Sequence, residues 1–472
     1  MSLVAGVDSS TQSTKIEIRD LVTGELIGQA SAGHPPASPP VSEQSPESWW
    51  SALQAAFGQL SGHLDDVVAV SVAAQQHGLV CVDEVGNSLR PAQLWNDTTS
   101  ANQAHSLVAR LGAPEWARIV GVVPVPSITI TKLAWLKENE PAIFERATAF
   151  MLPHDYLTSK LTDRRTTDRG DASGTGWWSP INDRYEPDLL ALVTDDPTGV
   201  IHRLPEVLGP RDIAGQLTVE AAAATGLREG IPVACGTGDN MAAAYGLGLS
   251  HGDIAMSLGT SGTVYGITES PVSDETGTVA GFADANGQFL PLVATLNATK
   301  VTDTIARLLG VDASGFAALA RTAMPDPRLV VTPYFDGERT PNLPNATGAI
   351  AGLDNWTSRG DIAAAAHIGV ICGLLHGIDA LESVGVETDG TLHLTGGGAR
   401  SEAFQQWVAD LWGRPIAVHA TSEAVATGAA KQAAAVAMDT EPHWHDKPDF
   451  VIEPRQEVDR TAYRETYRSV VY

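Results

Sequence analysis

The chain has 472 residues, which exceeds the size of one ordinary domain and predicts two large ones. Hydrophobic residues make up 43% and charged residues 18%, a balance typical of globular proteins and not of disordered chains. The 56 acidic residues outnumber the 30 basic ones, and the formal net charge of −26 argues against binding of nucleic acid or of an anionic membrane surface.

Cysteine usage and apolar runs indicate the compartment. Cys81, Cys235 and Cys372 are far apart and lie in apolar runs, which favours buried thiols in a reducing compartment over disulfides or a metal site. The N-terminus has no basic region and reaches Asp8 early, which argues against a signal peptide. The longest apolar stretch, residues 362–377, is interrupted by histidines and predicts a buried helix, not a membrane span. We therefore expect a cytoplasmic protein.

The chain begins with a predicted β-hairpin. Residues 3–7 are apolar, residues 16–19 alternate as a half-buried strand does, and residues 8–15 are predicted to turn between them. The turn is rich in hydroxyls and starts with Asp8, so it is suited to bind an anion, while the acid is suited to hold a cation. An ordinary Ser/Thr-rich hairpin explains the same residues equally well.

Two polar clusters follow predicted strands in the first third of the chain. The apolar run at residues 67–74 predicts a buried strand, and it leads into Gln75-Gln76-His77-Gly78. After a further predicted strand at residues 79–82, the chain reaches Trp95-Asn96-Asp97. Open α/β sheets place ligand contacts at strand ends, although a lone histidine is usually structural. The likeness of the two clusters predicts one site for a hydroxyl-rich, sugar-like ligand.

The middle of the chain is predicted to be mainly helical before it reaches a third polar stretch. Residues 107–161 predict helices, Trp177 and Trp178 are interpreted as surface packing, and residues 205–230 predict turns and a short helix. Residues 236–240 then read Gly-Thr-Gly-Asp-Asn after an apolar strand. The glycines allow close approach of a ligand to the backbone, while Asp239 and Asn240 offer an acid and an amide. Taken alone, the stretch is better explained as a turn whose aspartate caps a helix.

An internal repeat lies just beyond this stretch. A predicted strand at residues 253–258, a hydroxyl-rich turn at 259–263 and a strand at 264–267 repeat the pattern of residues 3–19. Two copies half a chain apart indicate a duplicated domain, so we expect domains at residues 1–243 and 244–472. Duplicated domains of this kind face each other across a cleft, and a ligand bridging the two turns would lie beside Asp239.

A glycine triplet near residue 396 is suited to a nucleotide. Residues 391–394 predict a short strand that runs into Gly396-Gly397-Gly398 and then a helix, where bare backbone admits a base or phosphate. Other nucleotide motifs are missing, because the sequence contains no Gly-x-x-x-x-Gly-Lys-Ser/Thr and Met241 replaces the third glycine of the dinucleotide fingerprint. The hydrolase spacing Gly-x-Ser-x-Gly is also broken after Gly259-Thr260-Ser261.

Seven collinear motifs resemble those of the FGGY family of carbohydrate kinases, and within it the xylulokinase group. They span nearly the whole chain, at residues 8–15, 75–78, 95–97, 236–240, 257–263, 337–341 and 396–401. Gln-x-His-Gly with Trp-Asn-Asp and Gly-Glu-Arg-Thr-Pro favours xylulokinase over glycerol kinase. The resemblance implies an α/β fold of two actin-like (ribonuclease H-like) domains with a ligand cleft between them, the N-terminal one binding sugar and the C-terminal one binding nucleotide.

The resemblance also implies a reaction, the ATP-dependent phosphorylation of D-xylulose to D-xylulose 5-phosphate. Asp239 would be the general base that takes the proton of the sugar O5 hydroxyl as it attacks the γ-phosphoryl group. A carboxylate suffices despite its low pKa, because positioning and charge stabilisation supply most of the catalysis. Asp8 would hold Mg²⁺ directly or through water.

The remaining site residues carried over from the resemblance fall into two sets. The sugar would be bound or enclosed by Gln76, His77, Trp95, Asp97, Asp239 and Asn240. ATP would be bound by Thr11, Gly259, Thr260, Gly397, Gly398 and Ser401. Family habit adds the expectation of a homodimer.

Two features depart from the family pattern and leave alternatives open. Thr98 and Thr99 follow Trp-Asn-Asp where many relatives have arginine, and His154 stands in the scaffold where relatives often have lysine. The first change puts the sugar in doubt, so a kinase for another pentulose or polyol, such as ribulose or xylitol, is the alternative. A nucleotide-binding module without transfer chemistry is a further alternative, against which the retention of both Asp8 and Asp239 argues.

Overall fold

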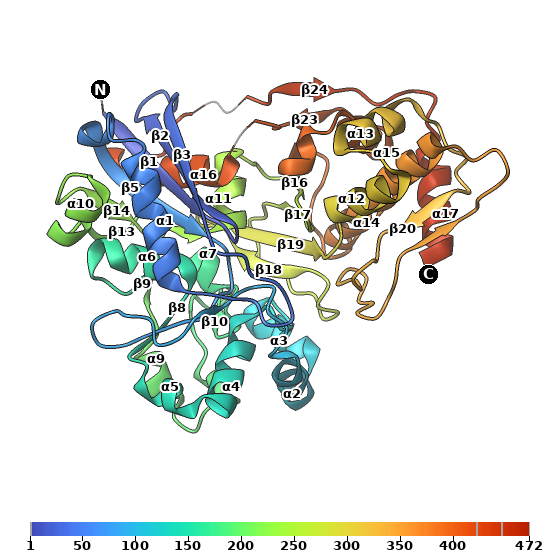
Figure 1. Cartoon of the computed structure of the whole chain (residues 1–472). Helices are drawn as coiled ribbons and strands as arrows, with labels where there is room; N and C mark the ends of the chain where they lie inside the picture. The colour runs from blue at the N-terminus through green and yellow to red at the C-terminus, as the bar shows by residue number, and fades with distance from the viewer. Residues whose placement is uncertain (1, 422, 445–446, 472) are drawn as a thin grey trace. The chain divides into compact units, whose positions relative to one another are not determined.

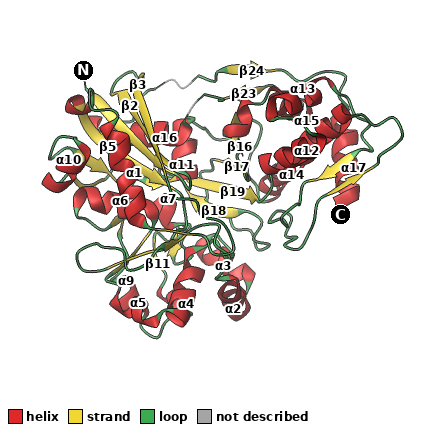
Figure 2. Ribbon diagram, viewed as in Figure 1, coloured by secondary structure: helices red, strands yellow, loops and turns green. Residues whose placement is uncertain are grey.

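The computed structural model describes residues 2–421, 423–444 and 447–471, and Figures 1 and 2 trace the chain by position and by secondary structure. The chain divides into two compact units, each built from three segments. The first unit comprises Met1–Gly248, Glu269–Leu290 and Glu423–Asp446, and the second comprises Leu249–Thr268, Pro291–Ser422 and Lys447–Tyr472. The units of packing are therefore not contiguous in sequence, and the boundary near residue 244 stays a prediction.

The first unit is built on a mixed sheet with the strand order β3-β2-β1-β5-β14-β13. β1, β2 and β3 are antiparallel, β5 is parallel to β1, β14 is parallel to β5, and β13 is antiparallel to β14. A short additional strand, β15, also pairs with β5. The bounds are β1 (Leu3–Ser9), β2 (Ser13–Asp20), β3 (Leu26–Gly33), β5 (Val67–Ala74), β13 (Ile213–Gln216), β14 (Pro232–Ala234) and β15 (Thr237–Gly238).

The sheet of the second unit repeats this pattern. The sheet has seven strands in the order β18-β19-β17-β16-β22-β23-β24, with β18 (Ala280–Ala283) at one edge. β16, β17 and β19 are antiparallel, β22 and β23 are parallel to β16, and β24 is antiparallel at the other edge. The bounds are β16 (Ile254–Leu258), β17 (Gly262–Gly266), β19 (Phe289–Thr295), β22 (Leu392–Thr395), β23 (Ile416–Val418) and β24 (Phe450–Ile452). From β19 to β24 the order and the directions match those of the first sheet from β3 to β13, as the strand, turn, strand repeat predicted.

The two faces of β1 explain how the first sheet is covered. Side chains alternate along a strand, so residues 3, 5 and 7 face one way and residues 4, 6 and 8 the other. The first set packs with α1 (Pro46–Gly58) in the main core of the unit. The second set faces α16 (Ala424–Met438), where a Cβ at Gly6 would lie 2.1 Å from the carbonyl oxygen of Ala426. Figure 1 shows this red helix against the blue strands β1 and β5.

The other elements of the first unit form short helices and ribbons around this sheet. Its further helices are α2 (Ala101–Leu111), α3 (Ala113–Val120), α4 (Thr129–Asn139), α5 (Pro141–Arg146), α6 (Pro153–Thr162), α7 (Arg169–Ala172), α8 (Pro187–Leu190), α9 (Pro197–Ile201), α10 (Val219–Thr225) and α11 (Asp239–Gly246). Its short strands are β4 (Glu43–Gln44), β6 (Val80–Val82), β7 (Ala92–Gln93), β8 (Ala149–Met151), β9 (Thr166–Asp168), β10 (Trp178–Ser179), β11 (Arg184–Tyr185) and β12 (Glu206–Leu208).

The second unit surrounds its sheet with longer helices. They are α12 (Thr299–Leu309), α13 (Ala313–Thr322), α14 (Arg359–Ser383), α15 (Glu402–Trp412) and α17 (Arg460–Val471), with the ribbon β20 (Val330–Thr332) and β21 (Ala349–Ala351). By length and composition α14 is apolar enough to cross a membrane, but 83% of its apolar window is buried inside the protein. The prediction of a buried helix at residues 362–377 is confirmed.

The structure corrects the sequence predictions in three places. The first turn spans only residues 10–12, since Asp8 belongs to β1 and Lys15 to β2. Trp177 and Trp178 are not surface residues, because their side chains are 3% and 1% exposed. Residues 205–230 contain two short strands, β12 and β13, besides the predicted helix. Strands of three or four residues carry too little alternation to be recognised in a single sequence.

Candidate active site

Three of the predicted polar clusters meet at one edge of the first sheet. Asp8 pairs with Ala73 where β1 and β5 run parallel, and Gly238 of β15 pairs with Ala74 at the end of β5. The carboxyl ends of these strands therefore lie together, with Gln76 and Asp239 in the residues that follow them. This is the edge at which open α/β sheets bind ligands.

Asp239 is the first residue of α11, and Gly238 precedes it as the capping residue. The aspartate therefore does not cap the helix, contrary to the simplest interpretation of the sequence. Its Oδ1 accepts hydrogen bonds from the backbone N–H of Asn240 at 2.8 Å and from Asn240 Nδ2 at 2.9 Å. Burial, followed by the charges of Asp8 and Asp171, raises the pKa of Asp239 to about 7. Its Oδ2 receives no hydrogen bond from the described residues, so this oxygen is placed to accept a proton.

Gln76 lies beside this carboxylate through Asn240, His77 follows it in the chain, and both are held by specific contacts. Asn240 Nδ2 donates to Gln76 Oε1 at 2.9 Å, and Gln76 is buried with its Nε2 making no hydrogen bond to described residues. His77 has a positive φ of 65°, a conformation that costs energy for a residue with a Cβ and occurs often at ligand sites. Its Nδ1 lies 2.9 Å from the carbonyl oxygen of Gly174, so Nδ1 carries the proton and donates it.

The Trp95 cluster is joined to the first turn, but its polar groups are largely engaged. Trp95 Nε1 donates to Thr11 Oγ1 at 3.0 Å, and Thr11 Oγ1 donates to Gln75 Oε1 at 3.0 Å. Asp97 Oδ2 accepts from the Ser42 N–H at 2.7 Å, and its Oδ1 accepts from both the N–H and the hydroxyl of Thr99. Thr99 therefore helps to fix the loop through Asp97, and Asp97 holds its own chain.

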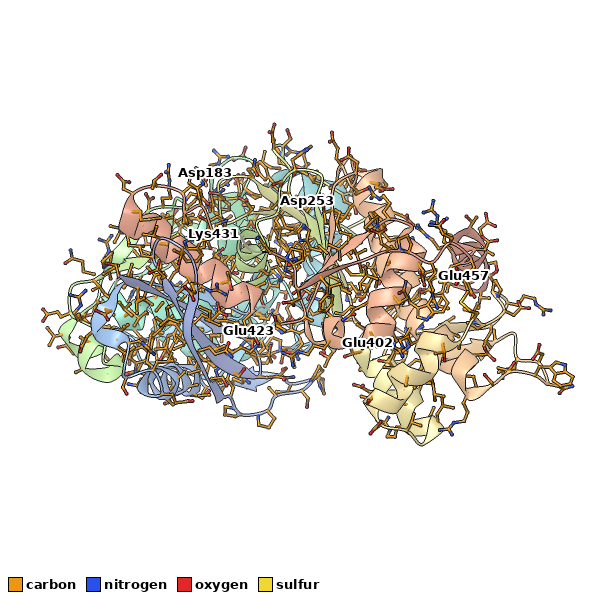
Figure 3. The ribbon with its side chains drawn as sticks, turned by 90° about the horizontal axis from the view of Figure 1, so that it is seen from above. Asp183, Asp253, Glu402, Glu423, Lys431 and Glu457 are labelled. Atoms are coloured by element: carbon orange, nitrogen blue, oxygen red, sulfur yellow. The ribbon has the colours of Figure 1, made fainter. Side chains whose placement is uncertain are left out.

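Asp8 combines burial with an unpartnered oxygen. The residue is 4% exposed, and its Oδ1 is buried without a hydrogen bond from the described residues. Burial raises its pKa to about 7, the charge of Lys15 lowers it, and those of Glu423 and Glu17 raise it. Lys15 Nζ lies 2.6 Å from Glu423 Oε2 at the start of α16, where Figure 3 labels Glu423. A buried anionic oxygen of this kind suits a cation.

One segment at the site was missed by sequence reasoning. Residues 168–174 connect β9, α7 and the His77 loop, and Asp168 Oδ2 accepts a hydrogen bond from Thr237 Oγ1 at 2.7 Å. Asp171 contributes to the raised pKa of Asp239. The only indication in the sequence was a run of small and polar residues, Thr-Thr-Asp-Arg-Gly-Asp-Ala-Ser-Gly, inside a mainly helical region.

In the second unit, the repeated turn and the glycine triplet lie at one edge because β16 and β22 are parallel. Gly396 has a φ of +85°, and a Cβ there would lie 2.7 Å from the Leu258 carbonyl oxygen, so the triplet packs against the end of β16. Gly398 packs on the Leu258 side chain, whereas a Cβ at Gly397 would meet nothing within 4 Å. Ser401 caps α15, its Oγ accepting from the Phe404 N–H.

A buried glutamate supports the repeated turn. Glu338 Oε1 accepts from the Leu296 N–H at 2.6 Å, and Oε2 accepts from Asn297 Nδ2 at 2.9 Å. The next N–H groups along the chain, those of Ala298 and Thr299, donate to the carbonyl oxygens of Thr260 and Gly259. These hydrogen bonds engage both carbonyl oxygens of the turn, and Thr260 itself is exposed.

The comparison with known families decides the assignment. Residues 3–246 match the N-terminal domain, and residues 254–437 the C-terminal domain, of the FGGY family of carbohydrate kinases.

The chain belongs to this family.

Relatives of this FGGY kinase agree with the assignment. A xylulose kinase of Streptomyces rubiginosus is 45% identical over 93% of this chain and 89% of its own length. A xylulose kinase of Streptomyces coelicolor is 46% identical over 92% and 87%, respectively. The crystal structure of a xylulose kinase from Bifidobacterium adolescentis has a TM-score of 0.87 at 39% identity, covering 100% of this chain and 99% of that chain.

These similarities confirm the predicted fold class and enzyme class. The FGGY kinase consists of two α/β domains of the actin-like type and is a carbohydrate kinase with ATP as phosphoryl donor. No group of three or more His, Cys, Asp or Glu side chains within the described part of the chain is arranged to hold a metal ion. A single buried carboxylate, that of Asp8, nevertheless fits Mg²⁺, which in kinases is bound by one or two carboxylates together with phosphates and water.

Proposed function

We propose that this FGGY kinase transfers the γ-phosphoryl group of ATP to O5 of D-xylulose, with Asp239 as the general base. The observation that carries the proposal is the Asp239 carboxylate, whose pKa is raised to about 7 and whose Oδ2 has no hydrogen bond from the described residues. Gln76, His77 and Asn240 surround it with amide and imidazole groups suited to a ketose. The xylulose kinases among its relatives support this choice of sugar.

The raised pKa of Asp239 strengthens its role beyond what the sequence suggested. A general base works best when its pKa lies near the operating pH. The O–H bond of the sugar O5 breaks as Asp239 Oδ2 takes the proton, and O5 forms a bond to the γ-phosphorus. The bond between that phosphorus and the β–γ bridging oxygen breaks, and ADP leaves. In phosphoryl transfer the positioned hydroxyl and the charge around the phosphate supply most of the rate.

Within the sugar site we propose different duties for the predicted residues. Gln76 Nε2 and Asn240 bind sugar hydroxyls, and His77 contacts the sugar with its imidazole. Trp95 lines the site, held by its hydrogen bond to Thr11. Asp97 shapes the loop through the hydrogen bonds that both of its oxygens accept from Ser42 and Thr99, and it lines the sugar site.

For ATP we propose that the turn at Gly259 and Thr260 binds phosphates through the N–H and hydroxyl of Thr260, with Gly259 shaping the turn as its own N–H donates to the Ser261 carbonyl oxygen. We propose that Gly397 and Gly398 flank the adenine and ribose. The open space at Gly397 supports its contact with nucleotide. Thr11 contributes through its backbone, since its hydroxyl joins Gln75 and Trp95, and Ser401 acts by capping α15. Asp8 would hold Mg²⁺, which would supply charge neutralisation at the phosphates.

We also propose a cytoplasmic homodimer that binds neither nucleic acid nor membranes. Three buried, free cysteines support a reducing compartment. The net charge of −26 opposes association with anionic polymers and lipids.

Glu338→Gln tests the support of the phosphate turn. We expect the KM for ATP to rise about tenfold and the KM for D-xylulose to change less than about twofold, because the weakened contacts to Leu296 and Asn297 displace the turn. Steady-state kinetics with each substrate varied measures both constants. The control is Glu457→Gln, at an exposed residue that Figure 3 labels. An unchanged KM for ATP in the folded variant contradicts the proposed support.

A substrate panel tests the function itself. ADP release is coupled to a spectroscopic assay with D-xylulose, D-ribulose, xylitol and glycerol, and sugar-free ATP hydrolysis is subtracted. We expect kcat/KM for D-xylulose to exceed that of every other acceptor at least about tenfold, with phosphorus NMR placing the phosphate on O5. Preference for ribulose or xylitol reassigns the sugar. Turnover of none of them, with ATP still bound, indicates the module without transfer chemistry.

A further inference from the structure

A single histidine lies among three buried aspartates next to the base. His154, in the first turn of α6, is fully buried, and its Nδ1 lies 2.7 Å from Asp171 Oδ2. Its Nε2 lies 3.2 Å from Asp155 Oδ1 and 3.8 Å from Asp168 Oδ1. The three carboxylates are each no more than 2% exposed. They come from three elements: Asp155 from α6, Asp168 from the end of β9, and Asp171 from α7.

The charges of this cluster depend on one another. Burial lowers the pKa of His154, but Asp155, Asp171 and Asp168 together raise it to about 9, so the imidazole is a cation at neutral pH. Burial raises the pKa of each aspartate, and the imidazolium lowers it again. Tyr185 beside Asp155 and Cys235 beside Asp168 are the next titratable groups, and burial raises the pKa of both, so they are neutral.

The cluster contacts the stretch that carries the base. A Cβ at Gly236 would lie 2.7 Å from His154 Cδ2, so only glycine lets the chain pass over the ring. Thr237 Oγ1 donates to Asp168 Oδ2 at 2.7 Å. Asp239 is influenced by the charges of Asp8 and Asp171. Three of the five residues from Gly236 to Asn240 are thus coupled to the histidine or its aspartates.

We infer that His154 is a positioning residue of the phosphoryl transfer. Its imidazolium holds Asp168 against Thr237 and Asp171 near Asp239. In this way it fixes the orientation and the proton affinity of the base. The inference rests on the proposed function. Buried carboxylates without a cation repel one another, and this repulsion raises the pKa of a neighbouring base. The imidazolium prevents this without contacting the sugar, ATP or the reacting atoms.

The test compares wild type with His154→Gln, which removes the cation, and His154→Lys, which restores one. The titration of the Asp239 carboxyl is followed by carbon-13 NMR in protein labelled at the aspartate carboxyl carbons, with the signal assigned by its loss in Asp239→Asn. We expect His154→Gln to move this titration to higher pH by about one unit, because the negative charge of Asp171 is no longer offset. kcat/KM for D-xylulose at pH 6 falls about tenfold accordingly. His154→Lys brings both values back close to wild type.

A second variant keeps the inference testable if His154→Gln does not fold. Asp171→Asn removes the negative charge beside Asp239, so the Asp239 titration moves to lower pH, opposite to the histidine variant. The control is His367→Gln, another buried histidine, which lies between Phe316 and Phe404 and whose pKa is lowered by burial to about 4. Its substitution lowers stability and leaves the Asp239 titration unchanged.

The outcomes separate the inference from the proposed function. An unchanged Asp239 titration in folded His154→Gln or Asp171→Asn overturns the inference, as does a folded lysine variant that restores neither value. The NMR titration is made without substrate. A chain that phosphorylates none of the sugars contradicts the proposed function, while the titration still reports on the cluster.

Discussion

Asp239→Asn is expected to lower kcat for D-xylulose about a thousandfold, within the range that general acid–base catalysis contributes. Asparagine keeps the size of the side chain and the Oδ1 acceptor for Asn240, so the α11 start retains its local hydrogen bonds. The Kd for D-xylulose, measured by titration calorimetry, is expected to stay within about threefold of wild type. Loss of turnover with D-xylulose binding retained is the result expected if Asp239 is the general base.

The pH profile gives this prediction a second measurement. Only deprotonated Asp239 accepts a proton, so a pKa of about 7 makes wild-type kcat/KM rise with pH and level off above about 7. The residual activity of Asp239→Asn lacks this rise. Asp183→Asn, an exposed substitution labelled in Figure 3, is the matched control and leaves kcat unchanged. Turnover close to that of wild type in Asp239→Asn contradicts the role of Asp239 as the general base.

Asp8→Asn is expected to reduce kcat/KM for ATP about a hundredfold and to raise the Mg²⁺ concentration needed for half-maximal activity. The reason is that a buried anionic oxygen without a hydrogen bond is replaced by a neutral amide. Activity as a function of Mg²⁺ at fixed ATP measures the effect. Asp65→Asn, an exposed change in the same unit, is the control. Unaltered Mg²⁺ dependence in the folded variant contradicts the assignment of Asp8.

Asp8→Asn, which lowers activity, is predicted to raise the stability of the fold above neutral pH. The pKa of Asp8 is raised from 3.8 to about 7 on folding, so the folded protein binds this proton more tightly than the unfolded chain. The stabilising contribution is complete below pH 4 and is lost as the pH rises through about 7, a difference of about 4 kcal/mol. Asparagine does not ionise, so Asp8→Asn avoids this loss of stability at high pH. We expect the variant to melt higher than wild type at pH 8, and the difference to shrink toward pH 4.

The sequence was sufficient for the features that depend on neighbouring residues. Apolar runs ending in polar clusters located the ends of β1, β5 and β16, and the repeat of strand, turn and strand predicted two sheets of one topology. Parallel pairing then brings Asp8, Gln76 and Asp239 to one edge, because the carboxyl ends of parallel strands coincide. These parts of the site follow from local pattern together with general rules of sheet construction.

Contacts between distant residues could not be predicted in this way. Asp97 looked like a ligand residue, but Ser42, 55 positions away, uses one of its oxygens. The hydroxyl of Thr11 was predicted to contact phosphates, but in the structure it donates to Gln75 Oε1 and accepts from Trp95 Nε1. His154 was interpreted as scaffold, since nothing in the sequence indicates that Asp168 and Asp171 return to its ring. In each case the partner of a polar group is set by tertiary packing, while the predicted roles of these residues stay predictions.

The position of α16 has a consequence for how the protein is made. The helix that covers Val4 and Gly6 is formed by Ala424–Met438, more than 400 residues later in the sequence. During synthesis the strands of the first sheet leave the ribosome long before α16 is made. The apolar face that α16 covers is therefore exposed in the nascent chain. Such a face is a binding surface for chaperones. A premature stop before residue 424 would therefore leave an aggregation-prone fragment and not a free sugar-binding domain.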